Sequence, residues 1–228
     1  MSARIFIPAR MKSERLPNKP LKYIGDKTLI EHVYTRAKKT GYPVTILTDN
    51  EEIMNKYPNW DVVITDDCYT GTDRVASVIN NYNEKYIVNC QGDLPFITSN
   101  QIIQSIIALE YADVGTLVAP MEDDKINDVN TVKAITSKID GPFHKVNWCG
   151  RGTKYGDHHI GVYAFTKKTL LKYPKQRSLA ETIENLEQLR WLENNFSICA
   201  VKTDCVPIEV NTEEDLKIAN DRVNSERR

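Results

Sequence analysis

The first half of the chain alternates short apolar runs with longer segments whose apolar residues recur every three or four positions. The runs indicate strands and the recurrence indicates helices. The expected strands are Arg4–Ile7, Val44–Thr48, Val62–Ile64, Tyr86–Asn89 and Val114–Ala119. The expected helices are Thr28–Thr40, Arg74–Tyr82 and a segment capped by Ser99 that carries Ile102, Ile103, Ile106 and Ile107. Strands separated by helices in this way predict an α/β fold with a mainly parallel sheet covered on both faces.

The rhythm changes after about Pro120, where expected strands follow one another without long helices between them. These strands are Val132–Ser137, His144–Trp148 and His159–Phe165. An amphipathic helix is expected over Ser178–Asn195, with an inward face made of Leu179, Ile183, Leu186 and Leu189. Two further strands, Ser197–Lys202 and Ile208–Val210, are expected to close the sheet, and Thr212-Glu-Glu-Asp215 resembles a helix-start box. We therefore predict an extension of the sheet rather than a second copy of the first half.

Length and charge narrow the class of protein. At 228 residues the chain is long for one domain and short for two, so we expect a single elaborated domain. Its 30 basic and 31 acidic residues give a net charge of −1, which excludes a global field for nucleic acid or an anionic membrane. No run approaches the roughly 18 apolar residues of a membrane span. The five cysteines form no C-x-x-C pair, so we expect reduced thiols in a cytoplasmic protein.

The loop after the first strand concentrates positive charge where α/β sheets bind ligands, at the carboxyl end of a strand. One acid, Glu14, and five cations give the segment Pro8–Lys22 a charge of +4; the cations are Arg10, Lys12, Arg15, Lys19 and Lys22. Guanidinium forks and lysine ammonium groups suit a polyphosphate. A solvated basic loop is the alternative, but the position directly after a strand favours phosphate binding. The chain has neither a Walker A sequence nor G-x-G-x-x-G, so a P-loop NTPase or dinucleotide dehydrogenase is not indicated.

Three other features follow strands and carry candidate chemistry. Asp93, in the turn after Tyr86–Asn89, is a candidate ligand of Mg²⁺, although an aspartate after glycine is also an ordinary turn former. Asn211 follows the expected strand Ile208–Val210, and its alternative reading is a residue flanking a helix start. The pair His158-His159 leads into Gly161 and Tyr163, and such histidines are more often structural than functional.

These segments together resemble one enzyme family. The pattern from Ile7-Pro-Ala-Arg10 through Arg15-Leu-Pro and Lys19-Pro-Leu21 resembles the sugar nucleotidyltransferases that activate 2-keto-3-deoxy sugar acids with CTP. The later segments are similar to those of the 3-deoxy-manno-octulosonate (Kdo) cytidylyltransferases, in the same order, between about residues 4 and 220. They are Thr70-Gly-Thr-Asp-Arg74, Asn89-Cys-Gln-Gly-Asp93, His159-Ile-Gly-Val-Tyr163, Leu186-Glu-Gln-Leu-Arg190 and Val210-Asn-Thr-Glu-Glu-Asp-Leu216.

The resemblance implies a three-layer Rossmann-like nucleotidyltransferase fold that transfers CMP from CTP to the anomeric hydroxyl of a 3-deoxy-2-keto sugar acid, Kdo foremost. Residues from about 1 to 120 would form the nucleotide-binding part, and residues 121–228 the part for sugar binding and dimerisation. Implied catalytic residues are Arg10, Arg15, Lys19 and Asp93; implied nucleotide-binding residues are Pro8, Ala9, Arg10, Asp49, Thr72, Arg74 and Gln91. Implied sugar-binding residues are Gln91, His159, Tyr163, Glu187 and Gln188, and Asp93 and Asn211 would hold Mg²⁺. The resemblance also implies a homodimer and a role in lipopolysaccharide biosynthesis.

Three departures from the family pattern keep alternatives open. Leu94 stands where the family has glutamate, and Asn211 stands where it has aspartate. The family's Phe-Ser-Arg segment is not evident, and His144, Lys145 or Arg151 are candidates to supply its cation. The alternatives are a cytidylyltransferase for another nonulosonic or amino-sugar acid, and a nucleotide-binding protein with weakened catalysis.

Overall fold

The computed structural model describes residues 2–13 and 15–226, and their contacts divide the chain into two units. The first unit consists of Met1–Asn81, Asn89–Ile102 and Pro207–Arg228. The second consists of Tyr82–Val88 and Ile103–Val206. Strand β6 (Tyr86–Cys90) and helix α4 (Ser99–Ile107) each run across a boundary between them.

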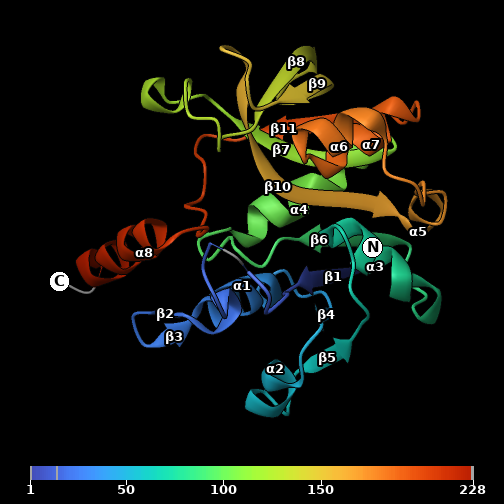
Figure 1. Cartoon of the computed structure of the whole chain (residues 1–228). Helices are drawn as coiled ribbons and strands as arrows, with labels where there is room; N and C mark the ends of the chain where they lie inside the picture. Colours follow the sequence, from blue (N-terminus) through green and yellow to red (C-terminus); the bar gives the residue numbers. More distant parts are fainter. Residues whose placement is uncertain (1, 14, 227–228) are drawn as a thin grey trace. The chain divides into compact units, whose positions relative to one another are not determined.

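Parallel strands form the centre of the first unit. Strand β1 (Ala3–Pro8) pairs with β4 (Val44–Thr48), and β4 pairs with β5 (Asp61–Ile64), both in parallel. Every residue of β4 is buried, as expected for a strand covered on both faces. Helix α1 (Leu29–Lys38) connects β1 to β4 and packs against both (Figure 1). The predicted parallel α/β arrangement is thus confirmed for this part of the chain.

Short caps explain where the other helices of the first unit begin. A capping box of Thr70 and Asp73 starts α3 (Gly71–Val78), and the predicted box of Thr212 and Asp215 starts α8 (Glu213–Glu226). Two shorter elements complete the helices, α2 (Glu51–Lys56) and the 3₁₀ turn η2 (Ile79–Asn81). The first loop contains a 3₁₀ turn η1 (Lys19–Leu21) and then a small hairpin of β2 (Tyr23–Ile24) and β3 (Lys27–Thr28).

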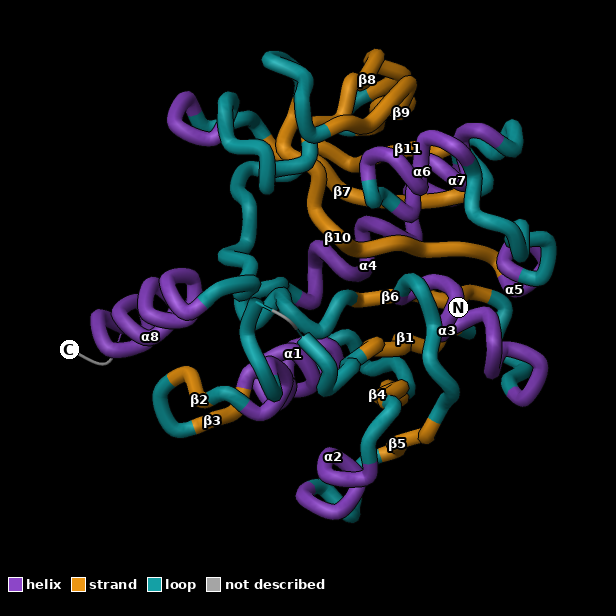
Figure 2. The backbone as a smooth tube through the Cα atoms, viewed as in Figure 1, coloured by secondary structure: helices purple, strands orange, loops and turns teal. Residues whose placement is uncertain are grey.

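The second unit contains a mixed sheet in the order β10-β7-β11-β9-β8 (Figures 1 and 2). Its strands are β7 (Val114–Ala119), β8 (Lys133–Asp140), β9 (Phe143–Gly150), β10 (Asp157–Thr166) and β11 (Ile198–Lys202). Only β7 and β11 pair in parallel; the other pairings that the second unit shows are antiparallel. The predicted strand-rich extension is confirmed. Its helical elements are α5 (Lys167–Leu170), α6 (Leu179–Glu184), α7 (Glu187–Glu193) and the 3₁₀ turns η3 (Ala108–Glu110) and η4 (Asp123–Lys125).

The expected single helix over Ser178–Asn195 is wrong. Asn185 adopts a left-handed conformation, with φ of 54°, and separates α6 from α7. Asparagine tolerates this conformation better than most residues. Leu179 and Ile183, expected to face inward, are 73% and 72% exposed. The helical spacing of apolar residues therefore extends over two separate helices, and these bury different sets of residues.

Two smaller predictions also need correction. Residues Ile208–Val210 form no strand; instead the Val210 amide donates to the carbonyl oxygen of Asp93 at 2.9 Å. The cap of α4 is Thr98 rather than Ser99, because the Thr98 hydroxyl accepts from the Gln101 amide at 3.1 Å. Ile208–Val210 has the composition of a strand, but its backbone binds the Asp93 turn instead of a strand. Ser99 is a common capping residue, but its neighbour Thr98 makes the capping hydrogen bond.

The remaining global expectations concern membranes and thiols. Among the described residues, no helix has the length and apolar character needed to cross a membrane. All five cysteines are free thiols, as predicted. Burial raises the pKa of Cys90 and Cys149 to about 12, so these two thiols stay protonated at neutral pH.

Candidate functional site

Lys19, Asp93 and Asn211 meet in the first unit although they are far apart in the sequence. The Lys19 ammonium lies 2.9 Å from Oδ2 of Asp93 and 3.1 Å from Oδ1 of Asn211. The backbone contact between Val210 and Asp93 holds the two later turns together. The structure therefore brings together one predicted cation and both predicted metal ligands, while their roles remain predictions.

The pair Asp93 and Asn211 fits a magnesium ion. Their two oxygen atoms converge on one positive group, the Lys19 ammonium, so the position between them already favours a cation. Mg²⁺ takes one or two carboxylates from proteins and completes its octahedron with water and phosphate oxygens. The described residues contain no cluster of three or more His, Cys, Asp or Glu side chains suited to a metal. A small oxygen donor set is thus the form in which this chain would hold Mg²⁺.

Glycine allows the Gln91-Gly-Asp93 turn to approach the end of β1. A Cβ atom added to Gly92 would lie 2.7 Å from the carbonyl oxygen of Pro8, closer than a side chain tolerates. Pro8 ends β1, and the next residue, Ala9, donates its amide to the Leu47 carbonyl at 2.8 Å. The turn that carries Asp93 therefore packs directly on the first strand-end.

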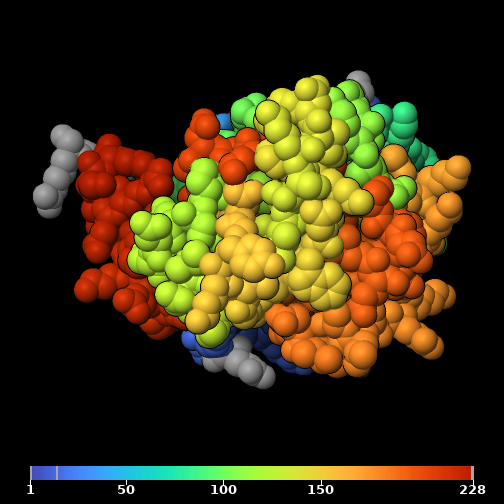
Figure 3. Space-filling model, turned by 90° about the horizontal axis from the view of Figure 1, so that it is seen from above, coloured from blue at the N-terminus to red at the C-terminus, as the bar shows by residue number. Residues whose placement is uncertain are grey.

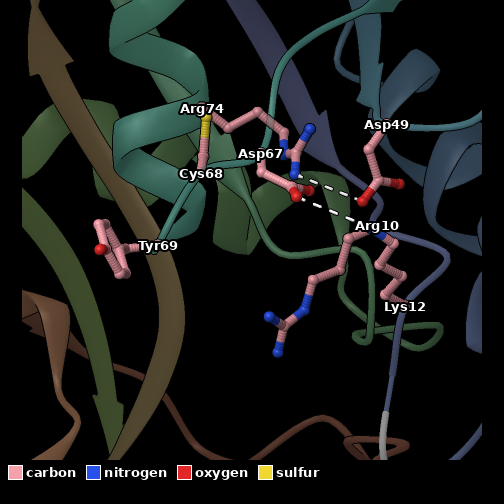
Figure 4. Close-up of a pocket in the computed structure, with 7 residues that line it drawn as sticks. All are labelled: Arg10, Lys12, Asp49, Asp67, Cys68, Tyr69 and Arg74. Atoms are coloured by element: carbon pink, nitrogen blue, oxygen red, sulfur yellow. Dashed lines mark ion pairs between the residues drawn. The ribbon is translucent and has the colours of Figure 1, made fainter.

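A pocket of about 440 Å³ opens within the first unit (Figure 4). Its lining comes from the loop after β1, the end of β4 and the segment between β5 and α3: Arg10, Lys12, Asp49, Asp67, Cys68, Tyr69 and Arg74. Three of the predicted nucleotide-binding residues, Arg10, Asp49 and Arg74, thus share one cavity. Its mixture of guanidinium, ammonium and carboxylate groups suits a charged, hydrogen-bonding ligand.

Arg74 and Asp49 form the buried wall of this pocket. The Arg74 guanidinium donates to the Thr65 hydroxyl and to the Asp66 carbonyl, and its Nη2 lies 3.9 Å from Oδ2 of Asp49. The other carboxylate oxygen of Asp49 accepts from the Met11 amide at 3.0 Å. Asp49 therefore ties the cationic loop to the end of β4 while it faces Arg74.

The exposed side of the pocket carries long cationic side chains. The Arg10 side chain is exposed, and Figure 4 shows it extending away from Arg74. The predicted catalytic Arg15 is also exposed, but it is not among the residues that line the pocket. Lys12 lies 3.7 Å from Asp67, with both side chains about four-fifths exposed. Such an exposed pair contributes little stability, so Lys12 is available to an anionic ligand. Of the predicted cations, only Lys19 already contacts the predicted metal ligands.

Gln91 and Thr72 pack around the start of α3. A Cβ atom added to Gly71 would lie 2.8 Å from Nε2 of Gln91. Thr72 is fully buried and accepts a hydrogen bond from Nδ2 of Asn89 at 3.1 Å. These contacts place Gln91 beside the first turn of the helix that carries Arg74.

Four of the five predicted sugar-binding residues lie in the second unit, whereas the fifth, Gln91, lies in the first. The buried ring of His159 on β10 lies 5.5 Å from the ring of Tyr163, centroid to centroid. The Tyr163 hydroxyl donates to Oε1 of Gln188 at 3.0 Å, and Gln188 is also buried. Glu187, half-buried, begins α7 next to it. The structure therefore groups His159, Tyr163 and Gln188 as predicted, with Glu187 adjacent along the helix.

His159 is a neutral imidazole at neutral pH. Burial, with a smaller contribution from the neighbouring His158, lowers its pKa to about 3. The Thr116 hydroxyl lies 3.1 Å from Nε2 of His159 and donates its single proton to the Val162 carbonyl at 2.8 Å. This network favours the tautomer with the proton on Nε2, which leaves Nδ1 as the acceptor.

Three residues were candidates to replace the arginine of the family's Phe-Ser-Arg segment. The Arg151 guanidinium donates to the Asn130 carbonyl, and Nδ1 of His144 lies 3.4 Å from the Thr136 hydroxyl. Lys145 is exposed on β9. Among the contacts of the described residues, none joins these three side chains to His159 or Gln188.

Sequence reasoning missed four residues of the pocket. Lys12 was counted only as part of the basic loop, and Asp67, Cys68 and Tyr69 were not considered. The last three stand between the end of β5 and the cap of α3. The rule that ligands collect after parallel strands would have found them had it been applied to β5.

The chain is similar to known proteins along most of its length. A cytidylyltransferase family model matches residues 5–202. The 3-deoxy-manno-octulosonate cytidylyltransferase of Rickettsia africae (strain ESF-5) is 37% identical over 227 residues, covering 94% of this chain and 92% of that protein. The protein of the same name from Rickettsia typhi (strain ATCC VR-144 / Wilmington) is 38% identical and covers 94% of each chain. A structure of CMP:2-keto-3-deoxy-manno-octonic acid synthetase complexed with CTP has a TM-score of 0.88 at 27% identity, covering 99% of this chain and 100% of that one.

Proposed function

Because the chain belongs to the cytidylyltransferase family, we propose that it transfers CMP from CTP to the anomeric hydroxyl of a 3-deoxy-2-keto sugar acid, with Kdo as the first candidate. The products are a CMP-sugar and pyrophosphate. The observation that carries the proposal is the convergence of Lys19 with Asp93 and Asn211 in the same unit as the Arg10–Arg74 pocket. Relatives that cover nearly the whole chain and bear the name of this activity support it.

The chain's cations have an electrostatic task in this reaction. A sugar carboxylate and a triphosphate repel each other, and two like charges about 4 Å apart cost about 4 kcal/mol at an effective dielectric constant of about 20. Arg10, Arg15 and Lys19 come from the loop that carries a charge of +4 and would neutralise phosphate oxygens as the α-phosphorus is attacked. Arg74, buried and already held by three neighbours, would present a fixed guanidinium.

We propose that Asp93 and Asn211 hold Mg²⁺. When bound, the ion would neutralise charge on the phosphate oxygens and on the departing pyrophosphate. Asp93 supplies the charge of this donor pair and Asn211 only a dipole, so we expect weaker metal binding than with two carboxylates.

The second unit would recognise the sugar by hydrogen bonds. Neutral His159 offers Nδ1 as an acceptor for a hydroxyl group, and Gln188 is oriented by Tyr163. Glu187 offers a carboxylate at the start of α7. Such donors and acceptors suit a polyhydroxylated acid, and they leave its carboxylate to cations.

One observation favours a different sugar acid as the second candidate. The segment that replaces Phe-Ser-Arg includes β9, and the guanidinium of Arg151, directly after β9, donates to the Asn130 carbonyl. A cytidylyltransferase for another nonulosonic or amino-sugar acid is therefore the alternative. Weakened catalysis loses one of its two supports, because Leu94 is fully buried and serves the core of the first unit.

Pyrophosphate release with CTP, Mg²⁺ and a panel of 3-deoxy sugar acids tests the proposal. We expect turnover with Kdo that depends on both CTP and Mg²⁺. Faster turnover with an amino-sugar acid would select the second candidate. Tight CTP binding without turnover on any acid would contradict both and leave a nucleotide-binding protein.

We further propose a homodimer formed through the second unit. Its exposed apolar side chains include Leu171, Leu179 and Ile183 around α5 and α6, and Trp148 on β9. Figure 3 looks onto the surface that the yellow β9 and the orange α5–α6 region contribute to. Where such side chains form one contiguous apolar surface, that surface is typical of a contact between proteins. We also propose that the protein is cytoplasmic and acts in lipopolysaccharide biosynthesis.

A further inference from the structure

A buried ion pair joins the two helices that replace the expected single one. Arg190 on α7 is 0% exposed and the Glu181 side chain on α6 only 1%. The pair is bidentate: Nε of Arg190 lies 2.7 Å from Oε2 of Glu181, and Nη2 lies 2.6 Å from Oε1. Arg190 belongs to the segment Leu186-Glu-Gln-Leu-Arg190, but nothing in the proposed reaction uses its charge.

The surroundings of the pair connect three segments of the second unit. The Arg190 guanidinium also donates to the Pro174 carbonyl at 3.1 Å and lies 4.5 Å from the centroid of the Tyr173 ring. Glu181 accepts in addition from the Ser178 amide at 3.3 Å. The loop before α6, α6 itself and α7 therefore meet at one guanidinium.

Gln188 and Arg190 hold opposite sides of α7. Residues two apart on a helix point about 200° from each other. Gln188 meets Tyr163 on β10, and Arg190 meets Glu181 on α6. Helix α7 has only seven residues, and the left-handed Asn185 two residues before it leaves its direction undetermined by the chain itself. Contacts on both sides must therefore set where Glu187 and Gln188 lie.

Stability alone does not explain two buried charges. Replacing such a pair by apolar side chains of similar volume is often neutral or stabilising, because desolvation offsets the attraction. A guanidinium that binds a carboxylate bidentately nevertheless fixes the relative orientation of the two groups. Apolar side chains do not impose such an orientation. We infer that Arg190 and Glu181 are positioning residues that orient α7 so that Glu187 and Gln188 can receive the sugar acid. This inference rests on the proposed function.

The test replaces both charges of the pair; Arg177, whose Nε also lies 3.6 Å from Oε1 of Glu181, is 28% exposed and keeps access to solvent. In Glu181→Leu/Arg190→Met we expect a melting temperature within about 4 °C of the parent, KM for the sugar acid raised about 10-fold, and KM for CTP changed less than about 2-fold. Arg190→Lys keeps the charge but not the fork, and we expect a smaller rise in the same KM. Should the double variant fail to fold, Arg190→Lys is decisive.

A matched control removes another close ion pair of the second unit. Lys202 on β11 lies 2.7 Å from Asp157 on β10, and neither residue belongs to α6 or α7, so Lys202→Met should leave both KM values unchanged. A folded double variant with the parent's KM for the sugar acid would overturn the inference. An equal rise in both KM values would also overturn it, since that indicates general damage.

Failure of the proposed function gives a different result. If the parent protein turns over no sugar acid, hydrogen exchange of the amides at 186–194 replaces the kinetic measurement. Faster exchange there in the double variant, with the rest of the second unit unchanged, supports positioning by the pair. Unchanged exchange at 186–194 would refute it.

Discussion

Lys19 joins the two proposed metal ligands of the first unit, Asp93 and Asn211. Its single ammonium group contacts a carboxylate and an amide oxygen that are 74 and 192 positions away along the chain. Asp93 supplies one negative charge and Asn211 only a dipole, and the Lys19 ammonium occupies the position between their oxygens. Each of them is a sequence-predicted residue, but the sequence could not show that the lysine bridges the other two.

Loss of a charge at this site is expected to slow the reaction strongly. We predict that Arg15→Ala or Asp93→Ala lowers turnover at least about 100-fold, equivalent to about 2.7 kcal/mol of transition-state stabilisation, with the fold intact. Steady-state pyrophosphate release and circular dichroism measure the two effects. Lys27→Ala, which removes an exposed cation of β3, is the control. Unchanged rates in both site variants would remove these residues from the mechanism.

Two histidines, the half-buried His158 and the buried His159, give the protein a pH-dependent stability. Burial lowers the pKa of His159 to about 3, and burial together with Lys125 and Lys133 lowers that of His158 to about 4. The unfolded chain binds these protons near the ordinary value of 6.5. The unfolded state therefore binds more protons below that value, and stability present above pH 6.5 is lost as the pH falls.

Urea unfolding between pH 7 and pH 5 measures this effect. We expect the free energy of unfolding to decline by at most about 1.4 kcal/mol per pH unit for each histidine. His158→Gln/His159→Gln should flatten the decline. The same slope in this variant would assign the dependence to other groups.

At the scale of elements, strand-ends and tight turns decide which side chains meet. The turn Gln91-Gly-Asp93 packs on the end of β1 because Gly92 has no side chain. The sequence identified both strands and placed polar residues after them. It did not reveal that the backbone of Val210 would bind that of Asp93, because an irregular segment carries no periodic signal.

Substitution of this glycine should separate the two elements. In Gly92→Ala the new methyl group would meet the Pro8 carbonyl, and we predict a loss of about 1–3 kcal/mol in unfolding free energy together with reduced turnover. Gly152→Ala is the control, because an added Cβ there meets nothing within 4 Å. Chemical unfolding compares the two variants, and equal stability would show that the turn can yield.

At the scale of the whole molecule, the family fold and the proposed dimer are the features to compare with expectation. The Rossmann-like nucleotidyltransferase fold is confirmed by the similarity to a solved structure with a TM-score of 0.88. The dimer remains a prediction. Leu179 and Ile183 were expected in the core but are exposed, and the proposed dimer would bury them.

Charge placed on this surface should dissociate a dimer. We predict that Leu179→Asp/Ile183→Asp shifts the mass measured by light scattering from two chains to one without unfolding the protein. The change costs little in the separate chain, because both side chains are exposed there. Thr182→Asp, on an exposed residue of the same helix, controls for added charge. A monomeric parent protein would contradict the proposal.

Local signals in the sequence determined the alternation of strands and helices, the capping box at Thr212 and the cationic loop, because periodicity, caps and charge density are properties of neighbouring residues. The family motifs added which chemistry to expect. Tertiary structure alone decided that Asn185 divides a helix and that Arg190 forms a buried ion pair with Glu181. It also decided that Lys19 contacts both Asp93 and Asn211. These outcomes depend on contacts between distant residues, whose energies no short window of sequence contains.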